Sequence, residues 1–101
     1  MLGDLMGNME EKQNAMKAKL QQIELEEKLE GVTITANAAR EILNITIDSK
    51  YQSAEHGEEL EDILVVAMNN LLAKISEEEA RESQSMISDM LPPGMAGLFG
   101  G

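Results

Sequence analysis

The side chains of this 101-residue chain whose types and spacing could do chemistry are six of its eight bases. Lysine and arginine are the residues that neutralise phosphate groups. Lys12 and Lys19 are seven residues apart and share one face of a helical segment, and Lys17 flanks its other side. The simpler alternative is that all six are solubility residues paired with nearby glutamates. The six candidates are Lys12, Lys17, Lys19, Arg40, Lys74 and Arg81.

A catalytic centre is not expected from the residue inventory. His56 is the single histidine, cysteine is absent, and no G-x-S-x-G motif or Gly-rich phosphate loop occurs. Ser83, Ser85 and Ser88 lie in an acidic helical segment with no base beside them, so none is a promising nucleophile. The sequence therefore predicts a protein that is not an enzyme, with His56 as a solvated loop residue.

The acidic runs do not predict a metal site. The acids at 77–79 occupy consecutive helical positions and point in different directions, so they cannot converge on one ion. The acids at 55, 58 and 59 are likewise expected to be solvated, and no D-x-D-x-D-G loop is present. We expect no metal and no cofactor.

The net charge argues against nucleic acid and anionic membranes as partners. Nineteen acids against eight bases give −11. The excess is uneven: residues 1–50 carry −3 and residues 51–101 carry −8. A basic surface must therefore come mainly from the first half. The N-terminus lacks a signal-peptide pattern and no apolar run approaches 18 residues, so no membrane partner is expected.

The first long segment, about residues 4–22, has the composition of a helix. Its apolar positions recur at alternating spacings of three and four, as in a helix that packs along another helix. Two interpretations stay open: an amphipathic helix lying on its own domain, or an extended arm that pairs with a second helix. The recurring positions are Met6, Met9, Gln13, Met16, Leu20 and Ile23.

Period-two patterns follow, and they predict strands at about 23–29, at 32–37 and at 41–48. The connections, Glu30-Gly31 and 37–39, are so short that neighbouring strands must be antiparallel. The residues between 49 and 57 form a polar loop. In the third strand, alternation puts Leu43, Ile45 and Ile47 on one face and Ile42, Asn44 and Thr46 on the other.

A second helix begins after Gly57, and its apolar residues again recur at three and four. Val65 and Val66 widen the apolar surface beyond one stripe, which suggests that a second subunit covers part of it. The capping-box pattern at 76–79 either starts a new helix or lies within one that continues to about Met90.

The order helix, three strands, helix predicts an α+β fold of the α-β-β-β-α type with a small antiparallel meander. We expect one domain over residues 1–91 and a Pro/Gly-rich tail over 92–101. The residues expected in the core or in a dimer contact are Met9, Met16, Leu20, Ile45, Leu64, Val65, Met68 and Leu72.

Four strings in this order resemble the YbaB/EbfC family of bacterial nucleoid-associated proteins. They are MLGDLMG at 1–7, VTITAN at 32–37 with ITID at 45–48, LEDILVVAMNN at 60–70, and LPPGM at 91–95. The chain departs from the family pattern at Ala38, where glycine is usual, at 69–71, and in a shorter first hairpin.

The resemblance implies an intertwined homodimer with protruding helical arms in a tweezer-like arrangement, located in the cytoplasm at the nucleoid. The leading hypothesis is a dimer that grips duplex DNA through its arms, with the six bases contacting phosphates and with weak sequence preference. The alternative, suggested by the −8 second half, is an acidic interaction dimer that serves as an adaptor to a DNA-processing protein and binds little DNA itself.

Overall fold

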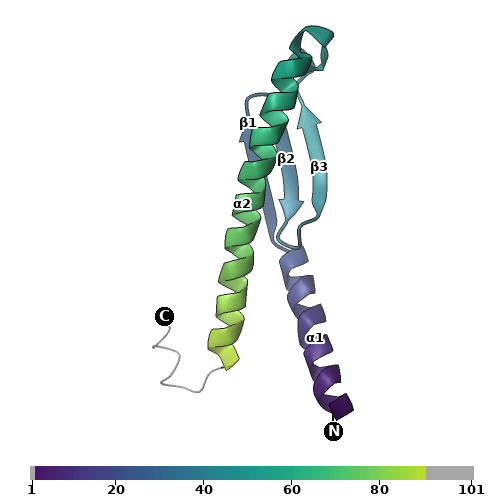
Figure 1. Cartoon of the computed structure of the whole chain (residues 1–101), viewed down its shortest axis with the longest axis vertical. Helices are drawn as coiled ribbons and strands as arrows, with labels where there is room; N and C mark the ends of the chain where they lie inside the picture. Colours follow the sequence, from purple (N-terminus) through teal and green to yellow (C-terminus); the bar gives the residue numbers. More distant parts are fainter. Residues whose placement is uncertain (1, 91–101) are drawn as a thin grey trace.

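Two long helices and a three-stranded antiparallel sheet make up the fold (Figure 1). The structure, a computed structural model, describes residues 2–90. Its elements are α1 (Leu2–Gln21), β1 (Glu24–Leu29), β2 (Val32–Asn37), β3 (Ile42–Ile47) and α2 (Gly57–Met90), with short 3₁₀ turns at Ser49–Gln52 and Ala54–His56. The predicted α+β class and element order are confirmed. The predicted tail, 92–101, lies outside the described residues.

Helix α2 is continuous over 34 residues and spans about 50 Å. The capping-box pattern at 76–79 therefore lies inside one helix rather than starting a second. Glu58 and Glu59 occupy the first turn, where acids complement the positive end of the helix dipole. This helix runs nearly the whole length of a molecule that measures 62 × 32 × 17 Å (Figure 1).

The core lies between one face of the sheet and one stripe of α2. The strand order is β1-β2-β3, so β2 is central, and its Val32, Ile34 and Ala36 are buried on the face toward α2. The buried residues of α2 follow at intervals of four, which keeps them on one side of the helix. They are Ile63, Ala67, Leu71 and Ile75.

The loop after β3 contributes to this core, although its composition is polar. Tyr51 is only 4% exposed and packs in the core cluster. Its ring also closes over the β1–β2 turn, where a Cβ on Gly31 would lie 2.6 Å from Tyr51 Cε2. Glycine is required at this position because the Tyr51 ring approaches so closely.

Strand β3 corrects the sequence prediction of its two faces. The register shifts between Thr35 and Ala36, so that Ile45 stands opposite Ile34 while Ile42 stands opposite Ala36. Residues directly opposite in a sheet share a face, and the bulge therefore puts Ile42 on the same side as Ile45. Simple alternation had put them on opposite sides, because it cannot register one extra residue.

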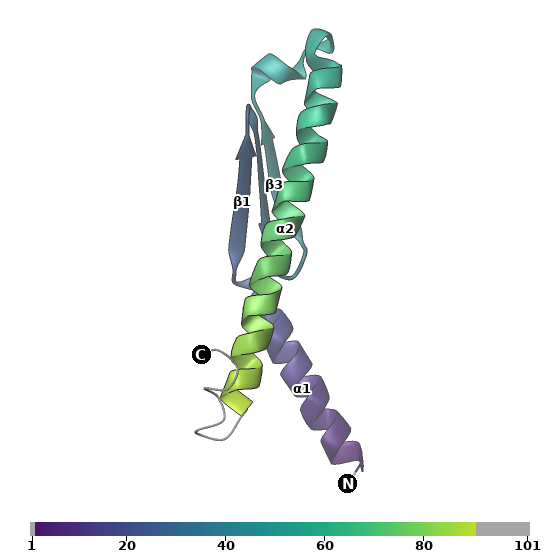
Figure 2. The same cartoon turned by 60° about the vertical axis from the view of Figure 1, so that its left-hand side comes forward.

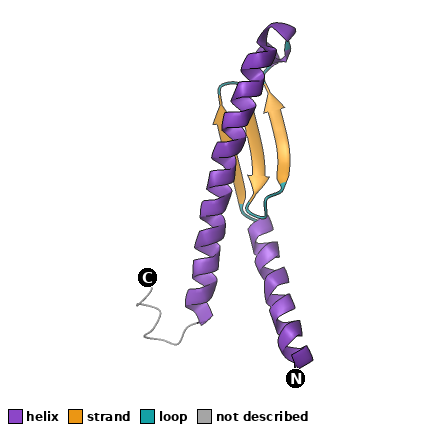
Figure 3. Ribbon diagram, viewed as in Figure 1, coloured by secondary structure: helices purple, strands orange, loops and turns teal. Residues whose placement is uncertain are grey.

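Helix α2 packs mainly over β1 and β2, and leaves β3 at an uncovered edge (Figure 3). Ile42, Leu43 and Ile45 are consequently 43–49% exposed. Within the described residues β3 pairs only with β2, so its outer backbone edge has no partner strand. An apolar edge strand in this state is a surface suited to pairing.

Helix α1 projects beyond the sheet as an arm, diverging from the second half of α2 (Figure 2). Its root is tied to the β2–β3 turn, because the Ala38 N–H donates to the carbonyls of Leu20 and Ile23 at 3.1 and 2.9 Å. Met9 is 55% exposed, whereas Met16 and Leu20 are half-buried and face α2. The helix does not lie on its own sheet.

Candidate nucleic-acid interface

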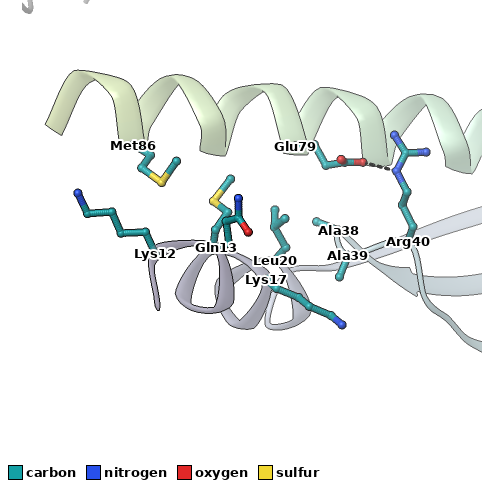
Figure 4. Close-up of a pocket in the computed structure, with 10 residues that line it drawn as sticks. Lys12, Gln13, Lys17, Leu20, Ala38, Ala39, Arg40, Glu79 and Met86 are labelled. Carbon is teal, nitrogen blue, oxygen red and sulfur yellow. Dashed lines mark ion pairs between the residues drawn. The ribbon is translucent and has the colours of Figure 1, made fainter. Parts of the chain in front are cut away.

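A groove separates the arm α1 from the second half of α2 (Figure 4). It consists of two adjoining cavities of about 330 and 250 Å³, which share Lys12, Met16 and Met86. Leu20 and Ala38 close the end nearest the sheet. The groove is therefore apolar at its base, with charged side chains along its borders.

Four of the six candidate bases border this groove. Lys12, Lys17 and Arg40 line the larger cavity, and Lys19 joins Lys12 at the smaller one. Figure 4 shows Arg40 directed toward α2 and Lys17 directed away from it. Neither Lys12 nor Lys17 forms an ion pair with any side chain that the structure describes. The fold thus gathers bases from α1 and from the β2–β3 turn, two separate segments.

Arg40 is presented by a turn that Asn37 organises. The buried Asn37 accepts hydrogen bonds at Oδ1 from the N–H groups of Ala39 and Glu41, at 3.0 and 3.2 Å. Its Nδ2 donates to Glu41 Oε1 at 2.8 Å, which, with a further bond from Gln21, lowers the pKa of Glu41. These bonds hold Arg40 in the left-handed region, at φ 66°.

Two of the groove bases are paired with acids of α2. Lys19 Nζ lies 2.9 Å from Glu82 Oε2, and Arg40 Nε lies 2.7 Å from Glu79 Oε1. The hydrogen bond to Glu82, and then its negative charge, raise the pKa of Lys19. Both bases are therefore already engaged by carboxylates of the same chain.

The remaining two candidates lie elsewhere. Lys74 donates to the carboxylate of Glu27 and to the Glu26 carbonyl, while Asn70 donates to Glu27 at 2.9 Å, which ties α2 to β1. The Lys74 and Asn70 hydrogen bonds hold the pKa of Glu27 below its ordinary value. Arg81 pairs with Glu78 one turn away on α2. Neither base lines the two cavities.

The residues considered for catalysis and metal binding have structural contacts instead. His56 is half-buried rather than freely solvated: its Nδ1 lies 3.2 Å from Glu59 Oε2, and its ring meets Tyr51 edge-on. Within the described part of the chain, no three His, Asp or Glu residues are placed to hold a metal ion. No helix in that part is long and apolar enough to span a membrane.

Sequence reasoning identified the bases by type but missed the acids that face them. Glu79 and Glu82 were grouped with solvated charge, since nothing in a linear pattern joins them to residues 19 and 40. Asn37 was available as a signal, because asparagine in a very short connection is typical of a side chain that bonds the turn backbone. Its buried state could be known only from the fold.

The chain is similar to known proteins over nearly its full length. A model of the YbaB/EbfC DNA-binding family matches residues 1–90. A nucleoid-associated protein of Rhodopseudomonas palustris is 33% identical, covering 93% of this chain and 97% of that protein. A nucleoid-associated protein of Neisseria meningitidis is also 33% identical, covering 97% and 94%. The crystal structure of an uncharacterized Helicobacter pylori protein, HP0035, matches with a TM-score of 0.72 at 20% identity, covering 85% and 92% of the two chains.

Proposed function

Because the chain belongs to the YbaB/EbfC DNA-binding family, a bacterial family of nucleoid-associated proteins, we propose that it binds duplex DNA at the nucleoid as a homodimer, through phosphate contacts from its arms. The observation that carries this proposal is the gathering of Lys12, Lys17, Lys19 and Arg40 around the α1–α2 groove. Its relatives are named as nucleoid-associated proteins, which supports the same location in the cell.

Weak sequence preference is expected from the residue types available. Phosphate contacts position a protein on DNA and carry no base information. The chain has one tyrosine and one phenylalanine, and Tyr51 is buried in the core, so an aromatic base-stacking platform has little material. Binding should then depend on salt and little on sequence.

Uncovered apolar surface supports the dimer. On α2, Leu64, Met68 and Leu72 recur at intervals of four on the flank opposite Asn70, which faces β1; this flank therefore borders β3. Leu72 and Val65 are 43% and 61% exposed, beside the open edge of β3. A second copy pairing at that edge would cover both, since soluble monomers rarely leave such contiguous apolar surface open.

The predicted core and dimer residues divide accordingly. Leu64 and Met68 pack against the core, and Met16 and Leu20 line the groove. The remaining four, which are largely exposed in the single chain, are Met9, Ile45, Val65 and Leu72. Ile45→Lys would add a charge to the open β3 edge without touching the core stripe of α2. We expect light scattering to give a dimer mass for the unaltered chain and a monomer mass for this variant; a monomer in both would contradict the dimer.

DNA binding is tested by anisotropy titration of a labelled mixed-sequence duplex at low salt. Lys12→Ala with Lys17→Ala should weaken binding and lower the salt slope by about two, one per lost phosphate contact. The matched control is Lys28→Ala with Lys50→Ala, which removes the same charge away from the groove; it should leave the slope unchanged. No binding by the unaltered chain at tens of micromolar would contradict the proposal.

A second candidate function is an acidic dimer that docks onto a basic DNA-processing protein. It is favoured by the pairing of Lys19, Arg40, Lys74 and Arg81 with acids and by the net charge, which a dimer doubles from −11 to −22. A protein partner that stays bound in a pull-down after nuclease treatment would support this function. Loss of every partner with nuclease would support direct DNA binding.

A further inference from the structure

The two ion pairs at the groove share one geometry. In each, the acid comes from α2 and the base from the opposite border: Lys19 from α1, and Arg40 from the β2–β3 turn (Figure 4). Glu79 and Glu82 are three residues apart, which places both on one face of α2. A single face of α2 therefore supplies two carboxylates to two of the four bases proposed for DNA.

The partners in each pair differ in their access to solvent. The Glu82 and Glu79 side chains are 16% and 31% exposed, whereas those of Lys19 and Arg40 are 58% and 56% exposed. The carboxylate oxygens that face the two cations are out of contact with solvent. An approaching phosphate can thus reach either cation from solution, but it meets a cation whose inner side is occupied by a carboxylate.

We propose that Glu79 and Glu82 are internal competitors of DNA, which hold Lys19 and Arg40 until phosphates displace them. This inference rests on the proposed function and specifies how its interface is regulated. Carboxylate and phosphate oxygens accept the same charge-assisted hydrogen bonds from lysine and arginine. DNA therefore gains each of these two contacts only as α2 loses one, and the affinity is lower than the four bases alone would give.

Competition of this kind alters the salt dependence as well as the affinity. Each base that contacts a phosphate releases a condensed counterion and adds about 0.9 to the salt slope. A base that stays on its carboxylate releases none, and a carboxylate left behind by its base attracts a cation from solution. General repulsion between acids and DNA changes affinity without adding contacts. The slope therefore separates competition from bulk charge.

The test compares two pairs of substitutions that remove the same charge. Glu79→Gln with Glu82→Gln removes the competitors and preserves side-chain shape. Glu10→Gln with Glu11→Gln is the matched control, since both acids are exposed on α1 and neither pairs with a described side chain. Binding to a labelled mixed-sequence duplex is measured by anisotropy from low to moderate salt, with circular dichroism melts to verify folding.

We expect the Glu79/Glu82 variant to bind about tenfold more tightly or better than the Glu10/Glu11 control at 0.1 M salt, with a slope steeper by about two. Adding Lys19→Gln and Arg40→Gln to the first variant should remove the gain. Equal affinity and slope in the two variants, with the unaltered chain binding DNA, would overturn the competition alone. No binding by any of the proteins would overturn the proposed function with it.

Discussion

The two halves of this molecule are held together by different forces. In the half that contains the sheet, Ile34 and Leu71 are fully buried and the chain connections are short. In the half that contains the arm, α1 and the end of α2 border an apolar groove and are joined by ion pairs with largely exposed cations. Burial of apolar surface stabilises far more than exposed ion pairs do. The comparison assigns folding stability to the first half and leaves the second free to exchange partners.

The largest expected effect is at the centre of the core. Leu71→Ala should lower the free energy of unfolding by about 3 kcal/mol, because it removes fully buried methyl groups and leaves a cavity between α2 and β2. Urea denaturation followed by circular dichroism measures this. A loss below about 1 kcal/mol would mean that the sheet half repacks easily and is not the rigid part of the molecule.

Gly31→Ala should have the next largest effect. Its new Cβ would lie 2.6 Å from Tyr51 Cε2 and 2.9 Å from Asp48 Cβ, so the buried ring must move. We expect a loss of about 2 kcal/mol from this overpacking, measured in the same urea titration. The control Gly7→Ala introduces the same methyl group on α1 with nothing within 4 Å, and it should be neutral or slightly stabilising.

A smaller effect is expected at the polar link between α2 and β1. Glu27→Gln should cost about 1 kcal/mol at pH 7, because hydrogen bonds to a charged group are exchanged for neutral ones. The pKa of Glu27 is lowered in the folded state, so its contribution is complete above the unfolded value and is lost as the pH falls through the folded value. Urea titrations from pH 7 to pH 3 should therefore show the variant and the unaltered chain converging; a constant difference would contradict the ionic origin.

The smallest effect on stability is expected in the arm. Met16→Ala removes a half-buried side chain from the groove, and the free energy of unfolding should change by about 0.5 kcal/mol or less, as is usual outside the core. A loss as large as that of Leu71→Ala would contradict the division between the two halves. Amide hydrogen exchange would sharpen it, since α1 should exchange faster than β2.

Local patterns were sufficient to predict the elements of the fold. Period two in residues 32–37 and apolar spacing of three and four after Gly57 gave β2 and α2 within a few residues of their observed bounds. Short connections required antiparallel pairing. Two features could not follow from periodicity: the bulge that puts Ile42 beside Ile45, and the burial of Tyr51 in a polar loop. Each depends on which strand or ring lies opposite, which is a property of the assembled chain.

The candidate interface was predictable by residue type and not by arrangement. The bases near the start of the chain were identifiable because only lysine and arginine neutralise phosphate. The separation of Lys74 from the groove, and the pairing of Arg40 with Glu79, depend on how α2 crosses the sheet. Long-range charge pairs of this kind leave no trace in a linear pattern, so the acids at 79 and 82 were counted only as part of the −11.

The elongated shape has a hydrodynamic consequence. The radius of gyration is 19.0 Å, whereas a compact domain of about 100 residues has a value near 13 Å. A particle this extended experiences more friction in solution than a sphere of equal mass. A single chain would therefore elute early from a sizing column, at the volume of a larger globular protein, and its diffusion would be correspondingly slow. Light scattering, which reports mass independently of shape, is accordingly the measurement that distinguishes one copy from two.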